Sequence, residues 1–154
     1  MTAERLIAQV PGHWQVPGQF TINHSHGIRV GDMIWVGGQE DLDEHGNVRH
    51  PGDIEAQSHA VMQSLQAVIE DLGGTMGDVV QFNTFYSGEL SVEEWQRTYD
   101  IRFSYFPKPG PTATGILIGK ELNIPGIRVE VNAVAVVGSA ARDAARPTVP
   151  VVTA

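Results

Sequence analysis

A glutamate and an asparagine interrupt an apolar run near the end of the chain. In "IRVEVNAVAVV", residues 127–137, apolar residues alternate with others as in a β-strand, and Glu130 and Asn132 lie on the same face of that strand. Removing a carboxylate from water raises its pKa and suits it to proton transfer near neutral pH. Because an unpaired buried carboxylate is costly, we expect Glu130 to have a chemical role. The alternative is an acid at the strand end that is solvated or paired with Arg128.

Two histidines and a pair of glycines lie in earlier extended segments. His24 and His26 are two residues apart, a spacing that metal sites use, but no third ligand is evident and we predict no metal site. Gly37 and Gly38 precede Gln39 at the end of "MIWVGGQ". Glycines there allow a neighbouring chain to approach closely, or expose backbone N–H groups that bind a carboxylate or an oxyanion. Both readings stay open.

The spacing of apolar residues predicts an α+β fold with the order β-β-β-α-β-α-β-β and both helices on one face of the sheet. The first helix begins at Asp53, which can cap it, and ends about 20 residues later at Gly73-Gly74. The expected strands cover residues 4–9, 20–30, 33–39, 78–87, 112–122 and 127–137.

The second predicted helix carries a capping box, in which Ser91 precedes Glu94 by three residues, and it must stop before Pro107. Aromatic residues recur every four positions along it, which is typical of a buried helical stripe. These residues are Trp95, Tyr99 and Phe103.

We expect one domain over residues 1–137, followed by a flexible tail, rich in Ala and Pro, over residues 138–154. Helices on one face leave the other face of the sheet bare. Burying that face against copies of the same chain is the simplest solution, and it predicts a homo-oligomer.

Composition narrows the class of protein. The chain has 154 residues, with 18 acidic and 10 basic side chains and a net charge of −8, and its basic residues are scattered. Nucleic acid is therefore an unfavoured partner. The absence of cysteine excludes disulfides and thiolate chemistry, and no apolar run is long enough to cross a membrane. We expect a cytoplasmic protein without a membrane partner.

Several segments together resemble the Rid family (reactive intermediate deaminase, or YjgF-like). They are "GDMIWVGGQ", "DIEAQSHAVMQSLQAVIEDLGGTMGDVVQFNTFYS", "YFPKPGPTAT" and "VEVNAVAV", in that order. The resemblance covers roughly residues 15–137. It implies a chorismate-mutase-like fold, a homotrimer with ligand clefts between subunits, and hydrolysis of small imines and enamines without cofactor or metal.

The resemblance also assigns roles to single residues. Glu130 matches the carboxylate of the family's cleft, where it would activate water, and Asn132 follows it on the same face. His24 corresponds to a cleft tyrosine, and it would hydrogen-bond the substrate or transfer protons; the alternative is a hydrogen-bonded strand histidine. From the backbone N–H groups noted above, we expect Gly38 and Gln39 to bind substrate, together with Asn132.

One departure from the family concerns the substrate. Ala113 stands where the deaminase branch has an arginine that grips the substrate carboxylate, and Gly115 stands where a cysteine is usual. No neutral residue replaces a bidentate arginine contact. We expect Thr114 and Gly115 to supply a hydroxyl and backbone amides instead. The chain then belongs to a branch without this arginine, and its substrate is not a simple α-imino acid.

Three functions follow from these observations. The first is a cofactor-free hydrolase acting on a small imine, enamine or related unsaturated compound, with Glu130 and His24 as catalytic residues. The second is a regulatory trimer that binds a small ligand without chemistry. The third is a ribonuclease or translation inhibitor, an activity reported in the family, which the acidic charge balance disfavours.

Overall fold

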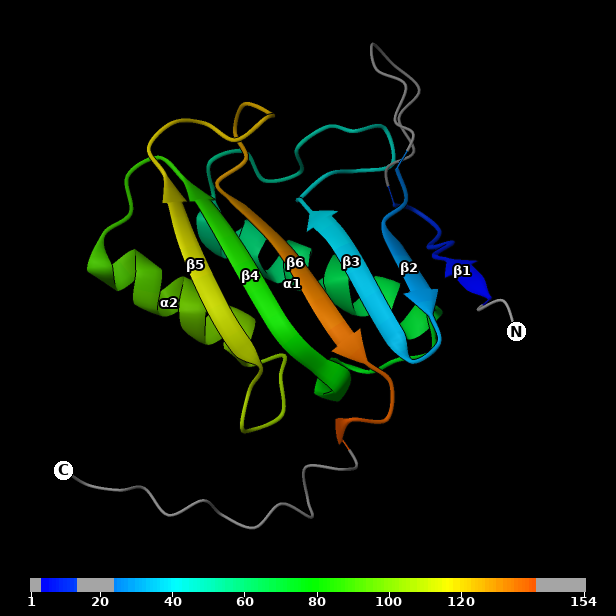
Figure 1. The fold of residues 1–154 in the computed structure, drawn as a ribbon. Coiled ribbons are helices and arrows are strands. Elements are labelled where there is room, and N and C mark those ends of the chain that lie inside the picture. Colours follow the sequence, from blue (N-terminus) through cyan, green and yellow to red (C-terminus); the bar gives the residue numbers. More distant parts are fainter. Residues whose placement is uncertain (1–3, 14–23, 141–154) are drawn as a thin grey trace, which may run out of the picture.

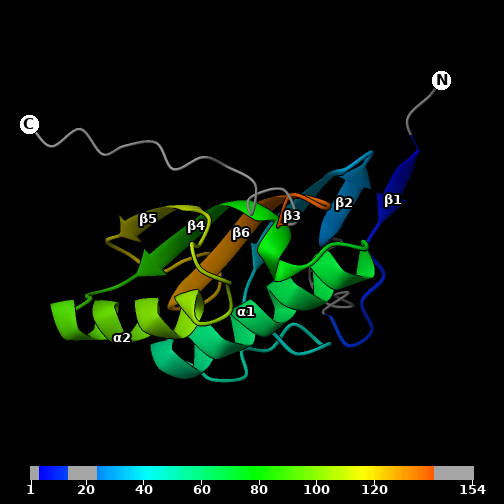
Figure 2. The ribbon, with the colours of Figure 1, turned by 90° about the horizontal axis from the view of Figure 1, so that it is seen from below.

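The computed structural model describes residues 4–13 and 24–140 and shows a sheet with two helices packed on one face (Figures 1 and 2). The predicted α+β fold and element order are confirmed. The elements are β1 (Arg5–Ile7), β2 (Gly27–Val30), β3 (Met33–Gln39), α1 (Ile54–Asp71), a 3-10 turn (Met76–Asp78), β4 (Val79–Ser87), α2 (Val92–Phe103), β5 (Thr112–Ile118) and β6 (Val129–Val136).

The six strands lie in the order β1-β2-β3-β6-β4-β5. The neighbours pair antiparallel except β4 and β5, which are parallel. A parallel pair needs a crossover, and α2 supplies it. This connection places β5 at one edge of the sheet and the last strand, β6, at its centre.

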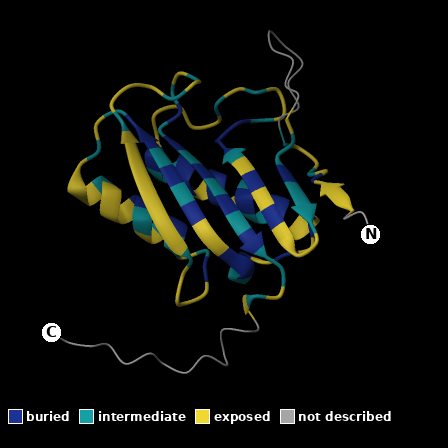
Figure 3. Ribbon diagram, viewed as in Figure 1, coloured by how far each residue is buried: buried dark blue, intermediate teal, exposed yellow. Residues whose placement is uncertain are grey.

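The central strand shows how the sheet divides the molecule into two environments. Val129, Val131, Ala133 and Ala135 are at most 2% exposed and pack toward the helices. The residues between them, beginning with Glu130, are only partly buried, and the burial colours alternate along β6 (Figure 3). Because successive side chains of a strand point to opposite faces, these residues lie on the other face. We call this second face the open face. The predicted alternation of the strand is confirmed, and Glu130 lies on the side that no helix covers.

Helix α1 forms where the sequence predicts it. The side chain of Asp53 accepts hydrogen bonds from the backbone N–H groups of Glu55 and Ala56, which otherwise lack partners at a helix start. At the other end Gly73 has φ +79°, a conformation that glycine adopts without a Cβ penalty. The apolar stripe between these ends, including Val61, Leu65 and Val68, is fully buried against the sheet.

Helix α2 differs from the expectation for its aromatic residues. The capping box of Ser91 and Glu94 is formed. However, Trp95 is 41% exposed, and the helix buries Thr98 and Arg102 instead. The three aromatic rings stack on one another, with centroids 5.3 Å apart for Trp95–Tyr99 and 4.1 Å for Tyr99–Phe103. Because α2 lies under the edge strand β5, only part of its surface has a sheet to cover it.

The expected segment 20–30 is a strand only from Gly27, and residues 20–23 lie outside the described residues. Near the other end, the chain remains attached to the domain just beyond residue 137. Ser139 donates to the backbone oxygen of Asp78, and the N–H of Ala140 donates to the Asp78 carboxylate, both over 3.3 Å. Residues 141–154 of the predicted tail lie outside the described residues. Within the described ranges, no helix is long and apolar enough to span a membrane.

Candidate functional site on the open face

A bulge in β3 organises the site. Val36 pairs with Ala133, whereas Gln39 pairs with Val131, so the register between β3 and β6 shifts by one residue at Gly37-Gly38. Such a bulge re-aims the side chains that follow it. Gln39 turns toward the helices and is 1% exposed, and its amide donates to the backbone oxygens of Gly37 (3.2 Å) and Gly38 (3.1 Å). Gln39 is the last paired residue of β3, and Glu40 follows it near enough to Glu130 for the two charges to interact.

Glu130 occupies the space that a side chain at position 38 would take. A Cβ placed on Gly38 would lie 2.1 Å from Oε1 of Glu130, so only glycine leaves room for this carboxylate. Burial raises the pKa of Glu130. Its expected alternative partner, Arg128, donates instead to the backbone oxygens of Ser87 (2.9 Å) and Glu89 (2.7 Å). Within residues 4–13 and 24–140 Glu130 therefore forms no ion pair.

Glu40 is a second buried acid that sequence reasoning missed. It is 6% exposed, and its Oε1 has no hydrogen-bond partner among the described residues. Burial raises the pKa of Glu40 to about 7, the charge of Glu130 acts in the same direction, and a hydrogen bond with Asn123 acts against it. The only signal in the sequence was an acid two residues after a glycine pair, and its meaning depends on the bulge.

Asn132 and Thr114 share the open face with Glu130. The Oδ1 of Asn132 accepts a hydrogen bond of 2.8 Å from Asn83, its partner on β4. Thr114 on β5 is in turn paired with Asn83, so the three residues form one row across the sheet. Glu130 lies in the next row, opposite Phe85.

Two other candidates on β5 face the opposite side. Ala113 pairs with the fully buried Phe82, and a Cβ on Gly115 would lie 3.3 Å from the ring of Tyr86, which is buried on the helix side. Successive side chains of a strand point to opposite faces. The structure therefore brings Thr114 to the face of Glu130 but does not bring the side-chain positions of Ala113 and Gly115 there.

His24 lies along a groove of about 680 Å³. Trp35 and Gly37 also line this groove. Gly37 is next in the chain to Gly38, against which the Glu130 carboxylate lies. His26 is directed elsewhere, because its ring packs edge-on against His13 at a centroid distance of 4.8 Å. The two histidines that the sequence places on one strand face thus lie ahead of β2 and have different neighbours. Among the described residues, no group of three or more His, Asp or Glu is arranged to hold a metal ion.

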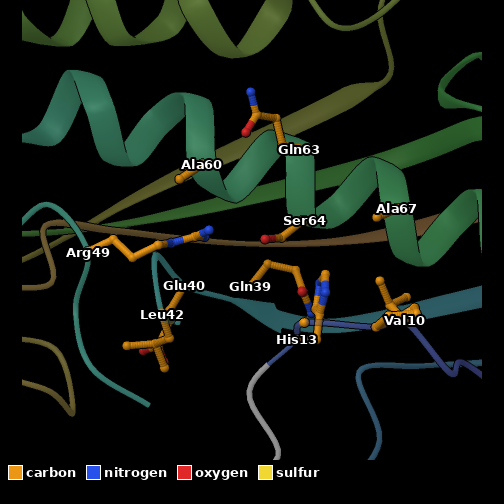
Figure 4. Close-up of a pocket in the computed structure, with 12 residues that line it drawn as sticks. Val10, His13, Gln39, Glu40, Leu42, Arg49, Ala60, Gln63, Ser64 and Ala67 are labelled. Atoms are coloured by element: carbon orange, nitrogen blue, oxygen red, sulfur yellow. The ribbon is translucent and has the colours of Figure 1, made fainter. Parts of the chain in front are cut away.

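A cavity of about 220 Å³ lies on the other side of Glu40. Figure 4 shows it between α1 and the segment that follows β3, with His13, Gln39 and Arg49 at its wall. From α1 it is lined by Ala60, Gln63, Ser64 and Ala67. Glu40 lines this cavity and also interacts with the charge of Glu130. It therefore connects the cavity with the open face.

One buried amide holds the two loops around this acid. Gln57 of α1 is fully buried and donates to the backbone oxygens of His50 and Gly126, each over 2.7 Å. Its oxygen accepts from the N–H of Arg128 at 2.7 Å. These bonds join the loop that begins with Glu40 to the loop that contains Asn123.

Comparison with known proteins places the chain in a family. A family model described as endoribonuclease L-PSP matches residues 19–137. The chain belongs to this family. A RutC family protein of Pyrococcus abyssi is 27% identical to this L-PSP family member over 97 residues, which cover 63% of this chain and 74% of that protein.

Solved structures agree on the fold. A member of the YjgF/YER057c/UK114 family from Mycobacterium tuberculosis superposes with a TM-score of 0.68 at 21% identity, covering 87% of this chain and 100% of that chain. RidA from an Antarctic Psychrobacter superposes with a TM-score of 0.65 at 21% identity, covering 80% and 94%. The resemblance to the Rid family is confirmed by these matches, and at this identity the two structures show the fold alone.

Proposed function

We propose that this L-PSP family member is a cytoplasmic, cofactor-free hydrolase that acts on a small imine, enamine or related unsaturated compound. The observation that supports it best is Glu130, a partly buried carboxylate with a raised pKa and no cation paired to it among the described residues. A carboxylate in such a setting is a candidate general base. The absence of cysteine supports a reducing compartment.

The reaction needs only water. Glu130 accepts a proton from a water molecule while the oxygen of that water attacks the carbon of the C=N bond. The nitrogen takes up protons, and when the carbonyl forms, the C–N bond breaks and ammonia leaves. An enamine first gains a proton on carbon to become the imine. His24 donates a hydrogen bond or transfers a proton at the groove that it lines.

We also propose that the open face is covered by two further copies of the chain in a homotrimer. Large apolar side chains on this sheet are exposed in the single chain, among them Met33 (41%), Trp35 (39%) and Ile116 (45%). Exposed apolar patches of this kind mark interaction surfaces. A trimer would enclose Glu130 in a cleft between subunits.

The substrate differs from a simple α-imino acid. Ala113 provides no cation, and its side chain points away from the face of Glu130. Thr114 remains available on that face as a hydroxyl donor, in a row with Asn83 and Asn132. Such a polar neutral row suits a hydrogen-bonding group of the substrate better than a carboxylate.

Ammonia release from a panel of small imines and enamines, with and without a carboxylate, tests the hydrolase. We expect turnover above the spontaneous rate, and a loss of about 100-fold or more in Glu130→Gln, the scale of a general base. Glu44→Gln is the matched control, because the Glu44 side chain is 65% exposed. Full turnover in Glu130→Gln contradicts the mechanism. Saturable ligand binding without turnover would assign the site to a regulatory trimer.

RNA cleavage, which the family description names, finds little support in this chain. Its net charge is −8. Five of its arginines have their guanidinium groups bonded to other parts of the protein; these are Arg29, Arg49, Arg97, Arg102 and Arg128. RNA cleavage by the purified protein that disappears in Glu130→Gln would reinstate this function.

A further inference from the structure

The bulge in β3 brings two acids together at the end of the strand. Gln39, opposite Val131, is the last paired residue of β3, and Glu40 follows it close enough to Glu130 for the two charges to interact. The missing side chain of Gly38 leaves the space that the Glu130 carboxylate fills. Glu40 is only 6% exposed, and its Oε1 has no hydrogen-bond partner among the described residues. A polar atom buried in this way lacks the partner that it would have in water.

The charged groups around the pair do not neutralise it. Arg49 lies at the wall of the same cavity, but its Nε is bonded to Asp41 at 2.9 Å. His13, also at that wall, has a pKa lowered first by burial and then by the charge of His26, which favours its neutral form. On the side of β6, Arg128 is turned to backbone oxygens. Within the described residues, the pair has no cation of its own.

We propose that Glu40 and Glu130 together bind the cationic nitrogen of a small ligand, such as a protonated imine or a primary amine. This inference rests on the proposed function and specifies the charge of its substrate. Each carboxylate would accept an N–H from the ligand, so the free Oε1 of Glu40 gains the partner that it lacks. Glu40 lines a cavity of about 220 Å³, which leaves room for a small molecule only; Glu130 does not line it, so the ligand nitrogen would lie at the Glu40 end, toward Glu130.

The same arrangement excludes an anionic ligand. Two acids facing each other repel a carboxylate, and Ala113 offers no cation to offset the repulsion. The site would therefore select by charge, preferring an amine or iminium over an acid of the same size. This preference is opposite in sign to the one that a substrate-binding arginine provides.

Binding and protonation of Glu40 then compete. Burial and the charge of Glu130 raise the pKa of Glu40 to about 7, so Glu40 is mostly protonated below this pH and mostly charged above it. A cationic ligand lowers the pKa of Glu40 by linkage, and its affinity rises with pH. If binding requires charged Glu40, affinity at pH 6 is about tenfold lower than at pH 8.

Carbon-13 NMR of the full chain with labelled glutamate side chains tests this without any turnover. The probes are ethylammonium chloride, ethanol and sodium propionate. We expect ethylammonium to shift the carboxyl signals of Glu40 and Glu130 saturably at pH 8 and about tenfold more weakly at pH 6. Propionate and ethanol are expected to leave both signals unchanged.

Glu40→Gln should weaken ethylammonium binding at pH 8 by about tenfold or more and abolish its pH dependence. Glu44→Gln, on the exposed part of the same loop, should retain both. Glu130→Gln tests the second acid separately, so that the proposal can still be tested if one of the two variants misfolds. The backbone amide NMR spectrum of each variant checks that it is folded. Equal affinity for propionate, or wild-type binding in both site variants, would overturn the proposal. The binding measurement does not depend on turnover. If ethylammonium binds but no imine or enamine releases ammonia, the hydrolase proposal fails while the binding proposal stands.

Discussion

Glu40 and Asp41 are neighbours in the chain, and both are buried acids, yet their surroundings differ. Asp41 is fully buried and accepts hydrogen bonds of 2.9 Å from the Nε of Arg49 and from the N–H and the Nδ1 of His50. Glu40, in contrast, keeps one carboxylate oxygen without a partner among the described residues. A buried acid whose bonds are satisfied holds the fold together, whereas one with bonds to spare can serve a ligand.

Removing Asp41 tests most directly whether this acid holds the loop in place. We expect Asp41→Ala to lower the free energy of unfolding by about 4 kcal/mol, because three hydrogen bonds to a fully buried carboxylate, from the partly exposed Arg49 and His50, are lost at once. Urea denaturation at pH 7 measures this loss, with Glu44→Ala as the control on the same loop. A change as small as that of the control would show that Asp41 does not hold the loop.

Replacing Glu40 should have the opposite sign. The pKa of Glu40 is raised from 4.5 to about 7, so its protonation stabilises the folded state fully below pH 4.5, and this stabilisation disappears as the pH rises through 7. Glu40→Gln lacks this decline. We measure the unfolding free energy of the variant minus that of the wild type. Between pH 4 and pH 8 we expect this difference to rise by about 3 kcal/mol in favour of the variant. Parallel curves of stability against pH would contradict the pKa and its cause.

The Gly38→Ala variant should change the position of Glu130 much more than it changes the stability of the protein. The new Cβ collides with the carboxyl end of Glu130, a flexible group that can move away, so we expect a loss of only about 1 kcal/mol in unfolding free energy. Displacement of Glu130 should nevertheless reduce both ammonia release and ethylammonium binding by more than tenfold. Unchanged activity and binding in a folded variant would mean that the position of Glu130 is not critical.

The smallest effect is expected for an exposed acid. Glu55 accepts a hydrogen bond of 2.6 Å from Arg97, but both side chains are about half exposed. Exposed ion pairs contribute little to stability, because water screens them and the side chains lose freedom. Glu55→Gln should therefore leave the urea midpoint nearly unchanged. A large drop in the urea midpoint would mean that an exposed acid stabilises this protein as much as a buried one.

The sequence was sufficient for features that depend on local spacing. The alternation around Glu130 identified its face, and Asp53 and Ser91 correctly marked the starts of the two helices. The aromatic stripe was predicted correctly only in part, because Phe103 packs against the core whereas Trp95 is 41% exposed, and exposure depends on where the edge of the sheet lies. Helical spacing does not contain that information.

The site was predicted only in part, for a related reason. Thr114 and Gly115 are adjacent in sequence, and strand alternation separates them onto opposite faces. Glu40 was missed because its position near Glu130 depends on the pairing of β3 with β6, which lie far apart along the chain. The roles of Glu130 and His24 stay predictions, to be decided by the experiments above.

The glycine pair in β3 also makes the protein unequally sensitive to two classes of mutation. Val36 pairs with Ala133 and Gln39 with Val131, so deleting either Gly37 or Gly38 would merge the two registers into one regular ladder and leave Gln39 opposite Val131. The bend that a bulge gives to its strand would be lost. A one-codon deletion would thus re-aim the end of β3 without removing any functional group, whereas a replacement at Gly38 would push the Glu130 carboxylate aside.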